Sequence, residues 1–148
     1  MTQTTRRLAA GSLGIVGHIH LVLAPEYFSE QAYIGVLFVL GAVALGAFAL
    51  RLWRGDDVPS WLLGALTMAA MGVGFVLSRT VGLPGFHESE WELSGVICLV
   101  LEAGFVAAAV AALSRGGATT RTAPAAAADD DVRFRREPAR EREPSLTR

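Results

Sequence analysis

Residues 31–50 read QAYIGVLFVLGAVALGAFAL, a stretch without a single charged side chain. A helix of about 20 apolar residues is long enough to cross the roughly 30 Å hydrocarbon core of a bilayer. A lone strand would leave its backbone N–H and C=O groups unpaired in lipid, whereas a helix pairs them internally. This stretch therefore predicts a transmembrane helix.

Three further stretches have the same character. Residues 8–24 and 58–78 carry no charge, and residues 93–114 contain Glu102 as their one charged side chain. Only short polar turns separate these stretches, so no folded extramembrane domain fits between them. With the interfacial ends included, the expected spans are residues 8–24, 31–52, 58–80 and 92–114. The predicted fold class is all-α, a four-transmembrane-helix bundle formed by residues 1–114.

Local signals mark the ends of these spans. Pro25 follows the first span, and Asp57 with Pro59 opens the third. Ser89 and Glu92 stand in capping-box spacing before the fourth. These residues predict helix boundaries to within a few positions.

The first span has an alternative interpretation as a signal peptide. Arg6 and Arg7 precede the apolar run, and Ala24 ends it with a small residue, as at a cleavage site. Pro25 argues against this, because its fixed φ and missing N–H suit an extended scissile segment badly. A transmembrane first helix is therefore the preferred prediction.

Arginine placement predicts the orientation. For four spans, one side of the membrane receives five arginines, and only Arg79 lies near the other. The five are Arg6, Arg7, Arg51, Arg54 and Arg115. Since arginine near span ends is retained on the cytoplasmic side, both termini are expected to be cytoplasmic. The predicted location is the cytoplasmic (inner) membrane, as a multi-pass protein with the lipid bilayer as its first partner.

The C-terminal part differs in composition from the four apolar stretches. Residues 115–148 hold eight arginines among six acidic residues and few apolar side chains, while the whole chain has a formal net charge of −1. So little apolar mass cannot offset the entropy of ordering, which predicts a disordered cytoplasmic tail. The mixture of charge signs, with few aromatic residues for stacking on bases, argues against nucleic-acid binding.

Three ionisable residues stand out because they lie within or beside the spans: His18, Arg79 and Glu102. A charge at the bilayer centre costs at least about 2.5 kcal/mol, so such groups normally face the protein interior. His18 shares its helix face with Gly11 and Gly14, small residues that let helices approach closely. We therefore expect a buried polar cluster of His18, Arg79 and Glu102 in the outer half of the bundle.

His20 is expected on a different face, because residues two apart in a helix project about 200° apart. It is assigned to an outer mouth together with several ionisable side chains near the outer turns. The outer mouth comprises His20, Glu26, Glu30, His87, Glu88, Glu90 and Glu92. This acidic set can gather divalent cations or protons, or it can simply reflect the exclusion of arginine from that side.

Helical phase also predicts which faces of the third and fourth spans meet. Gly64, Gly72 and Arg79 share a face of the third, and Glu102 and Phe105 share a face of the fourth. If these faces pack together, Arg79 and Glu102 approach each other. The two alternatives are an ion pair that fixes helix register and a proton or anion site in which Glu102 titrates.

Three functions fit these features. The first is a small integral accessory or interaction protein with the buried cluster. The second is a proton-coupled permeation or ion-binding protein that uses Glu102. The third is a haem- or metal-binding redox subunit, for which Met68, Met71, Cys98 and His18 form a set of soft ligands. No cofactor is predicted outright, since methionines in an apolar helix usually serve packing.

Other patterns narrow the possibilities further. A single cysteine excludes an intrachain disulfide and a CxxC redox pair. There is no Gly-x-Ser-x-Gly, phosphate-binding glycine loop or His-Glu-x-x-His motif, so an enzymatic role is not favoured. Glycines in the second span, at Gly35, Gly41 and Gly46, favour close packing within the bundle, in a homo-oligomer or with a membrane-protein partner.

Two stretches are typical of a family rather than of generic membrane sequence. Residues 20–27 read HLVLAPEY, and residues 78–88 read SRTVGLPGFHE, followed by Trp91 and Glu92. They resemble uncharacterised small four-helix integral membrane proteins of actinobacterial type. The resemblance covers about residues 6–114 and implies a membrane location, but it brings no activity, cofactor or catalytic residue with it.

Overall fold

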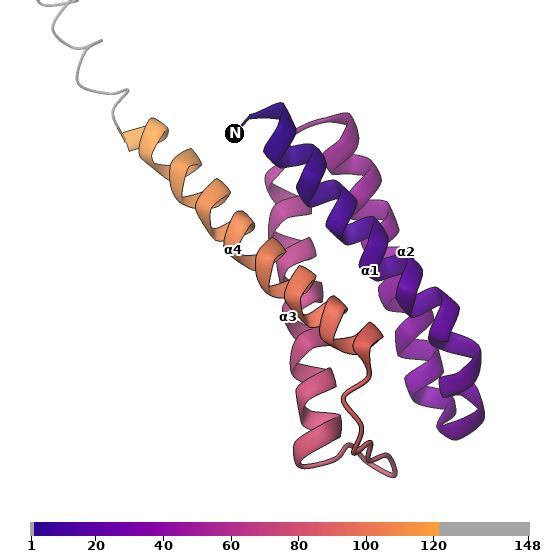
Figure 1. Cartoon of the computed structure of the whole chain (residues 1–148). Helices are drawn as coiled ribbons and strands as arrows, with labels where there is room; N and C mark the ends of the chain where they lie inside the picture. The colour runs from indigo at the N-terminus through magenta and orange to yellow at the C-terminus, as the bar shows by residue number, and fades with distance from the viewer. Residues whose placement is uncertain (1, 122–148) are drawn as a thin grey trace, which may run out of the picture. The chain divides into compact units, whose positions relative to one another are not determined.

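The computed structural model describes residues 2–121 of the chain. It contains α1 (Gln3–Glu30), α2 (Ala32–Arg54), α3 (Val58–Thr80) and α4 (Leu93–Arg121), and no named strand within the described residues (Figure 1). All four helices are long and apolar enough to cross a membrane. The predicted all-α architecture with four spans is therefore confirmed.

The chain divides into two compact units, and the packing described below concerns residues 2–114. The predicted disordered tail began at residue 115, but α4 continues through Arg121. The rest of that prediction, residues 122–148, lies outside the described residues.

Helix α1 extends beyond the predicted first span at both ends. Pro25 was expected to end this helix, yet it lies inside α1. Proline removes only one backbone donor, and transmembrane helices tolerate that loss when neighbouring groups compensate. The helix ends instead at Glu30. The next residue, Gln31, caps it with an extended backbone (φ −146°) and donates its N–H to Tyr27 O at 2.9 Å.

Asp57 opens α3 as predicted. Its Oδ2 accepts a hydrogen bond from Ser60 N at 2.9 Å, and its Oδ1 accepts one from Ser60 Oγ at 2.9 Å. Arg51 Nη2 donates to the same Oδ2 at 3.2 Å. Pro59 lies in the first turn, where its missing N–H has no helical partner to lose. The cap therefore ties the end of α2 to the start of α3.

The capping box predicted for α4 is wrong. The helix begins at Leu93, and Val96 N donates to Glu92 O at 3.0 Å as the first turn closes. Ser89 does not cap it, because its backbone N–H bonds to the Glu88 carboxylate at 3.1 Å. Ser89 is thus part of the preceding loop.

Side chains from all four helices form one core. The largest fully buried side chains include Leu13, Leu45, Trp61, Met68 and Phe105. The Trp61 and Phe105 rings stack with centroids 5.6 Å apart and join α3 to α4. Since lipid is as apolar as leucine, this close packing rather than exclusion from water holds such helices together.

Glycines set how closely the helices approach. A Cβ atom on Gly17 of α1 would lie 3.2 Å from Ala42 O in α2. A Cβ atom on Gly64 of α3 would lie 3.1 Å from the Phe105 ring of α4. These contacts leave little room for a side chain, so the two glycines allow the close approach of α1 to α2 and of α3 to α4.

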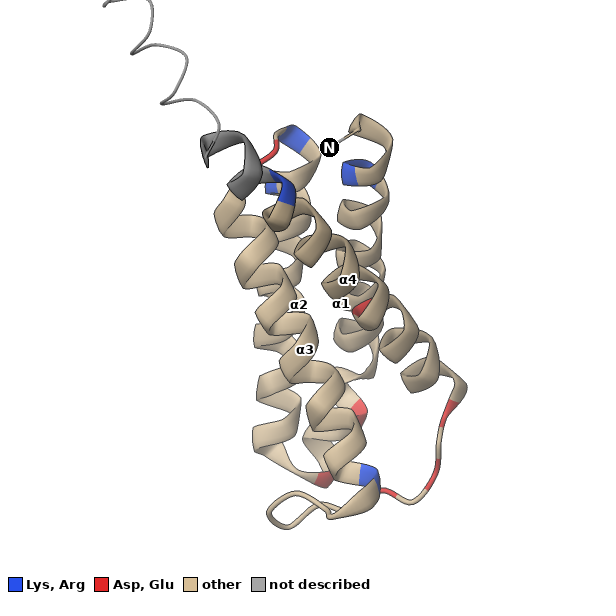
Figure 2. Ribbon diagram, turned by 90° about the vertical axis from the view of Figure 1, so that its left-hand side faces the viewer, with Lys and Arg blue, Asp and Glu red and all other residues tan. Residues whose placement is uncertain are grey.

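Charged residues separate along the bundle (Figure 2). Basic residues gather mainly at the end that holds the N-terminus, and acidic residues mainly at the opposite end. After the predicted orientation, we call the end with Gln31 and residues 81–92 the outer end and the opposite end the inner end.

The loop at residues 81–92 is fixed to the outer end. Leu83 and Phe86 exchange backbone hydrogen bonds of 2.7 and 2.9 Å, with Gly85 between them at φ +69°, a value that favours glycine. Gln31 Nε2 donates to Gly85 O at 2.7 Å, and Tyr33 Oη donates to the Pro84 carbonyl at 2.9 Å. The loop is therefore held against the start of α2.

Candidate functional site

Glu102 is the most deeply buried charged-type residue of the described chain, with 3% of its surface exposed. It projects from α4 towards α3, where a Cβ atom on Gly72 would lie 2.9 Å from its Oε2 atom. Oε2 has no hydrogen-bond partner among the described residues. A buried ionised carboxylate without a partner is costly, so the neutral acid or a bound cation suits this position.

A small cavity of about 30 Å³ lies beside Glu102 and is called here the polar chamber. It lies among all four helices, with His20 from α1, Phe38 from α2, Arg79 from α3 and Glu102 from α4 in its wall. A water molecule needs roughly 10 to 15 Å³ of such space, so the chamber has room for one or two. Its wall also contains Tyr27, Glu92, Ser94 and Cys98.

On its other side, Glu102 borders an apolar cavity of about 590 Å³ between α3 and α4. Leu99, Val106 and other apolar residues form the rest of that wall, and Glu102 is its one ionisable residue. The carboxyl group therefore lies between a small space with a mixed polar and apolar wall and a larger apolar one.

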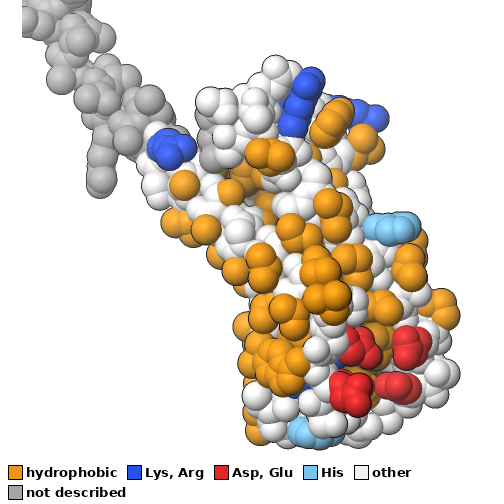
Figure 3. Space-filling model, viewed as in Figure 1, with side chains coloured by type: hydrophobic (Ala, Val, Ile, Leu, Met, Phe, Trp, Pro, Cys, Tyr) orange, Lys and Arg blue, Asp and Glu red, His pale blue; other side chains and the backbone are white. Residues whose placement is uncertain are grey.

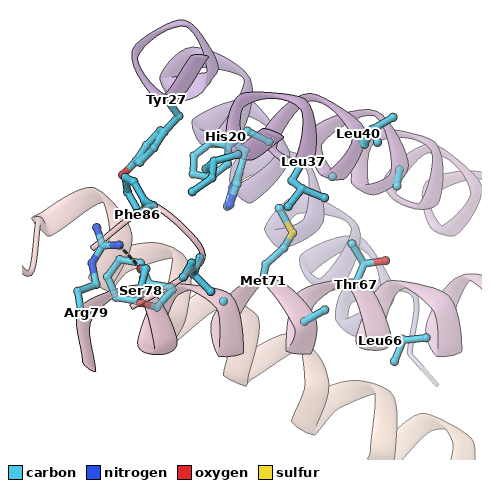
Figure 4. A pocket seen from close by; sticks show the side chains of 18 residues that line it. His20, Tyr27, Leu37, Leu40, Leu66, Thr67, Met71, Ser78, Arg79 and Phe86 are labelled. Atoms are coloured by element: carbon cyan, nitrogen blue, oxygen red, sulfur yellow. Dashed lines mark hydrogen bonds between the residues drawn. The ribbon is translucent and has the colours of Figure 1, made fainter. Parts of the chain in front are cut away.

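His20 is the histidine of the chamber. Its Nδ1 donates to Val16 O at 2.9 Å, because a carbonyl oxygen can only accept. In the neutral ring Nε2 is then a hydrogen-bond acceptor. The ring packs against Phe38 with centroids 4.6 Å apart, and it points from α1 into the space between the helices (Figure 4).

The prediction that His18 faces the interior is wrong, because His18 is exposed on α1. The interior face of α1 carries Leu13, Val16 and Ala24, and this spacing turns His20 inward instead. Gly14 was expected to allow another helix to approach closely. It is exposed instead, and a Cβ atom added to it would meet no heavy atom within 4 Å. The face of α1 that carries Gly14 and His18 thus meets no helix of the described bundle.

Arg79 lies at the outer end of the chamber and is partly buried. Its Nη1 donates to Ser78 Oγ at 2.7 Å, its Nε donates to Glu90 O at 3.2 Å, and its guanidinium lies 4.0 Å from the centroid of the Phe75 ring. The predicted faces of α3 and α4 do meet, but the Arg79–Glu102 ion pair does not form. Within residues 2–114, the ion pair found is Arg51–Asp57.

The outer mouth is mostly open surface. His87 is exposed, as are four of its glutamates, while Glu88 is partly buried and His20 lies inside. The four exposed glutamates are Glu26, Glu30, Glu90 and Glu92. Acidic side chains gather over this end of the molecule (Figure 3). Even so, the described residues contain no group of three His, Cys, Asp or Glu side chains placed to hold a metal ion.

The soft-ligand set is not assembled. Met68 and Cys98 lie in the core, whereas His18 lies on the exposed side of α1. Met71 contacts α2 instead, since its Cε would lie 2.7 Å from a Cβ atom on Gly41. A haem or metal centre built on these four residues therefore finds no support in their arrangement.

Sequence reasoning missed two residues of the site. Tyr27 is 7% exposed and Ser78 is 2% exposed, and both line cavities beside Arg79. Tyr27 follows the same helical spacing as Leu13 and His20, which is the signal that identifies it. Ser78 had no such signal, because a serine in an apolar helix commonly donates to its own backbone, as Ser78 Oγ does to Phe75 O at 2.8 Å, and this gives no sign of a second partner.

Comparison with family models, curated proteins and solved structures finds no match for this chain. The resemblance to small four-helix membrane proteins of actinobacterial type stays a prediction.

Proposed function

We propose that this small integral membrane protein binds and releases a proton at Glu102, as a proton-coupled permeation protein does. The observation that carries the proposal is the buried Oε2 atom of Glu102 without a hydrogen-bond partner in the described chain. An ionisable residue inside a membrane helix is costly and normally serves a function. A neutral acid removes most of that cost, and loss of its proton creates a charge that must be compensated.

The ion-pair alternative is less well supported. Arg79 is held by Ser78, by the Glu90 carbonyl and by the Phe75 ring, at the outer end of the chamber. It therefore does not neutralise Glu102 in this arrangement. A structural ion pair would fix helix register, whereas here packing at Gly64 and Phe105 does so.

The polar chamber gives Glu102 a site for proton exchange. Its wall also includes Glu92 and Ser94, where α4 begins at the outer end. The one or two water molecules that fit in this space can exchange a proton with the carboxyl group. Other titratable or charged groups also line the chamber. They are His20 and Tyr27 on α1, Arg79 on α3, Cys98 on α4, and Glu92 just before α4.

Proton uptake into liposomes tests this proposal. The purified protein is reconstituted, an acid pulse is applied outside, and an enclosed pH-sensitive dye reports the internal pH. We expect the wild type to conduct protons and Glu102→Gln to fall to the rate of protein-free liposomes. Glu30→Gln is the matched control, because it removes an exposed carboxylate at the outer end and leaves the chamber intact. Wild-type conduction by folded Glu102→Gln would refute the proposal.

A second candidate is the accessory or interaction role. Gly46 on α2 and Gly104 on α4 are exposed and have no heavy atom within 4 Å of an added Cβ. Another helix can approach closely at such positions. This favours association with a second copy or another membrane protein, which cross-linking in native membranes tests through bands above the monomer.

The proposed location is the cytoplasmic membrane with both termini inside. Arg51 and Arg54 lie at the inner end together with Arg6 and Arg7, and this distribution matches the retention of arginine on the cytoplasmic side. A cysteine introduced at Thr2 should then resist an impermeant thiol reagent in intact cells, and one introduced at Ser89 should react.

A further inference from the structure

A third cavity, called here the groove, lies between α1, α2 and α3 (Figure 4). It has a volume of about 530 Å³, within the roughly 300 to 1,000 Å³ typical of sites for small molecules. Leu37, Leu40 and Leu66 line it and are 58%, 61% and 66% exposed. The groove wall therefore continues onto the lipid-facing surface between α2 and α3.

The length of the groove matches one acyl chain. On α3 its lining runs from Leu66 to Arg79, which at about 1.5 Å per residue is roughly 20 Å. One leaflet of a bilayer contributes about 15 Å of hydrocarbon, half of the roughly 30 Å core. Met71 and Gly74 lie along this run, so its middle is apolar.

The outer end of the groove is polar. His20, Tyr27, Ser78 and Arg79 line it, and Figure 4 shows these side chains at one end of the cavity with Leu40 and Leu66 at the other. Phe86 of the outer loop covers this end and meets the Tyr27 ring at a centroid distance of 5.8 Å. The groove is thus amphipathic along its length.

The groove wall carries positive charge at its polar end, while Glu92 lines the neighbouring chamber together with Arg79. Arg79 is the one permanently charged residue that lines the groove, and no aspartate or glutamate of the described chain does so. The hydrogen bonds that Arg79 donates go to neutral acceptors, the Ser78 hydroxyl and the Glu90 carbonyl. A guanidinium in this state favours a carboxylate or another anionic headgroup.

We propose that the groove binds a free, single-chain anionic amphiphile, a long-chain fatty acid, with its carboxylate at Arg79 and its chain directed towards Leu66. The fit of one chain to the groove's length and volume argues for a free fatty acid rather than a two-chain phospholipid. This site does not depend on the proton-binding role of Glu102, which lines other cavities.

Native mass spectrometry of the full chain in a mild non-ionic detergent tests the proposal. Oleic acid is the probe, oleyl alcohol is the same chain with a neutral head, and phosphatidylglycerol is the anionic two-chain competitor. We expect one oleate per chain and weaker binding of both other lipids. Arg79→Gln should lower oleate affinity about tenfold to a hundredfold, the range expected for loss of a charge-assisted hydrogen bond, and should leave oleyl alcohol almost unchanged.

Gly74→Leu tests the groove independently of charge. An added Cβ at Gly74 meets no heavy atom within 4 Å, so a leucine fills the groove without a clash at its base. It should abolish binding of the acid and of the alcohol. Gly14→Leu is the matched control, since Gly14 has equally open space and does not line the groove. Wild-type binding by Gly74→Leu, equal binding of acid and alcohol by the wild type, or displacement of oleate by equimolar phosphatidylglycerol would overturn the proposal.

Discussion

Gly72 and Gly74 provide a paired test of whether the Glu102 side chain packs against α3. The two glycines lie two residues apart on α3, yet their surroundings differ. A Cβ atom on Gly72 would lie 2.9 Å from Glu102 Oε2 and 3.3 Å from Leu99 Cδ1, whereas one on Gly74 would meet nothing within 4 Å. Gly72→Ala should therefore force the carboxyl group to move, and Gly74→Ala should not.

The expected difference follows from this geometry. Each substitution gains up to about 1 kcal/mol of helix propensity, and this gain cancels when the two variants are compared. Inserting one carbon into a closely packed site costs about 1 to 3 kcal/mol. Since the Glu102 side chain can shift by a few tenths of an ångström, we expect the lower half of that range. Gly72→Ala should thus be about 1 to 2 kcal/mol less stable than Gly74→Ala.

Reversible unfolding in mixed detergent micelles, followed by circular dichroism, measures this difference. In the Glu102→Ala background most of the obstruction at Gly72 is gone, so the penalty of Gly72→Ala should shrink by about 1 kcal/mol. If Gly72→Ala is as stable as Gly74→Ala, or if its penalty is unchanged without the carboxyl group, Glu102 does not pack against Gly72 and the description of the site is wrong.

Two further predictions concern the core and the inner turn. Phe105→Ala should destabilise the bundle by about 3 kcal/mol. This is the lower end of the range for truncating a buried phenylalanine, because a side chain that moves into lipid loses less free energy than one that moves into water. Unfolding in micelles measures the loss, and an equal loss in the exposed control Val100→Ala would contradict the prediction. Burial is the largest single effect on the pKa of Asp57, and it raises that pKa. The hydrogen bonds from Ser60 and Arg51 together outweigh burial, so the pKa of Asp57 lies below its usual 3.8. The stability from this cap should be complete above pH 3.8 and be lost as pH falls through the lower folded-state pKa, so the acid decline of the unfolding midpoint should be shallower in Asp57→Asn, and parallel profiles would refute this.

The fold was predictable because the bilayer leaves few alternatives. Charge-free stretches of spanning length specify helices, and α3 begins and ends where residues 58–80 predicted. Asp57 was identified as a cap because a carboxylate two residues before a proline is typical of a helix start. Ser89 and Glu92 have the residue types and the spacing of a capping box, but Ser89 forms its hydrogen bond within the loop instead.

The candidate site was only partly predictable. The buried face of α4 was assigned correctly from Cys98, Glu102 and Phe105, since one carboxyl group fixes the phase of an otherwise apolar helix. The phase of α1 was not predicted correctly, because apolar residues face both the lipid and the interior. Small residues mark a close approach only where another helix is present. The sequence prediction therefore assigned His18 to the interior, where His20 lies.

Infrared spectroscopy of the protein in lipid bilayers tests the central claim, a neutral Glu102 carboxylic acid inside the bundle, most directly. Exposed carboxylates, with pKa values near 4, are ionised at neutral pH, so a carbonyl stretching band of a protonated acid would report a buried group. We predict such a band in the wild type and in Glu30→Gln, and its loss in Glu102→Gln. Absence of the band from the wild type at neutral pH, or its persistence in Glu102→Gln, would contradict the account.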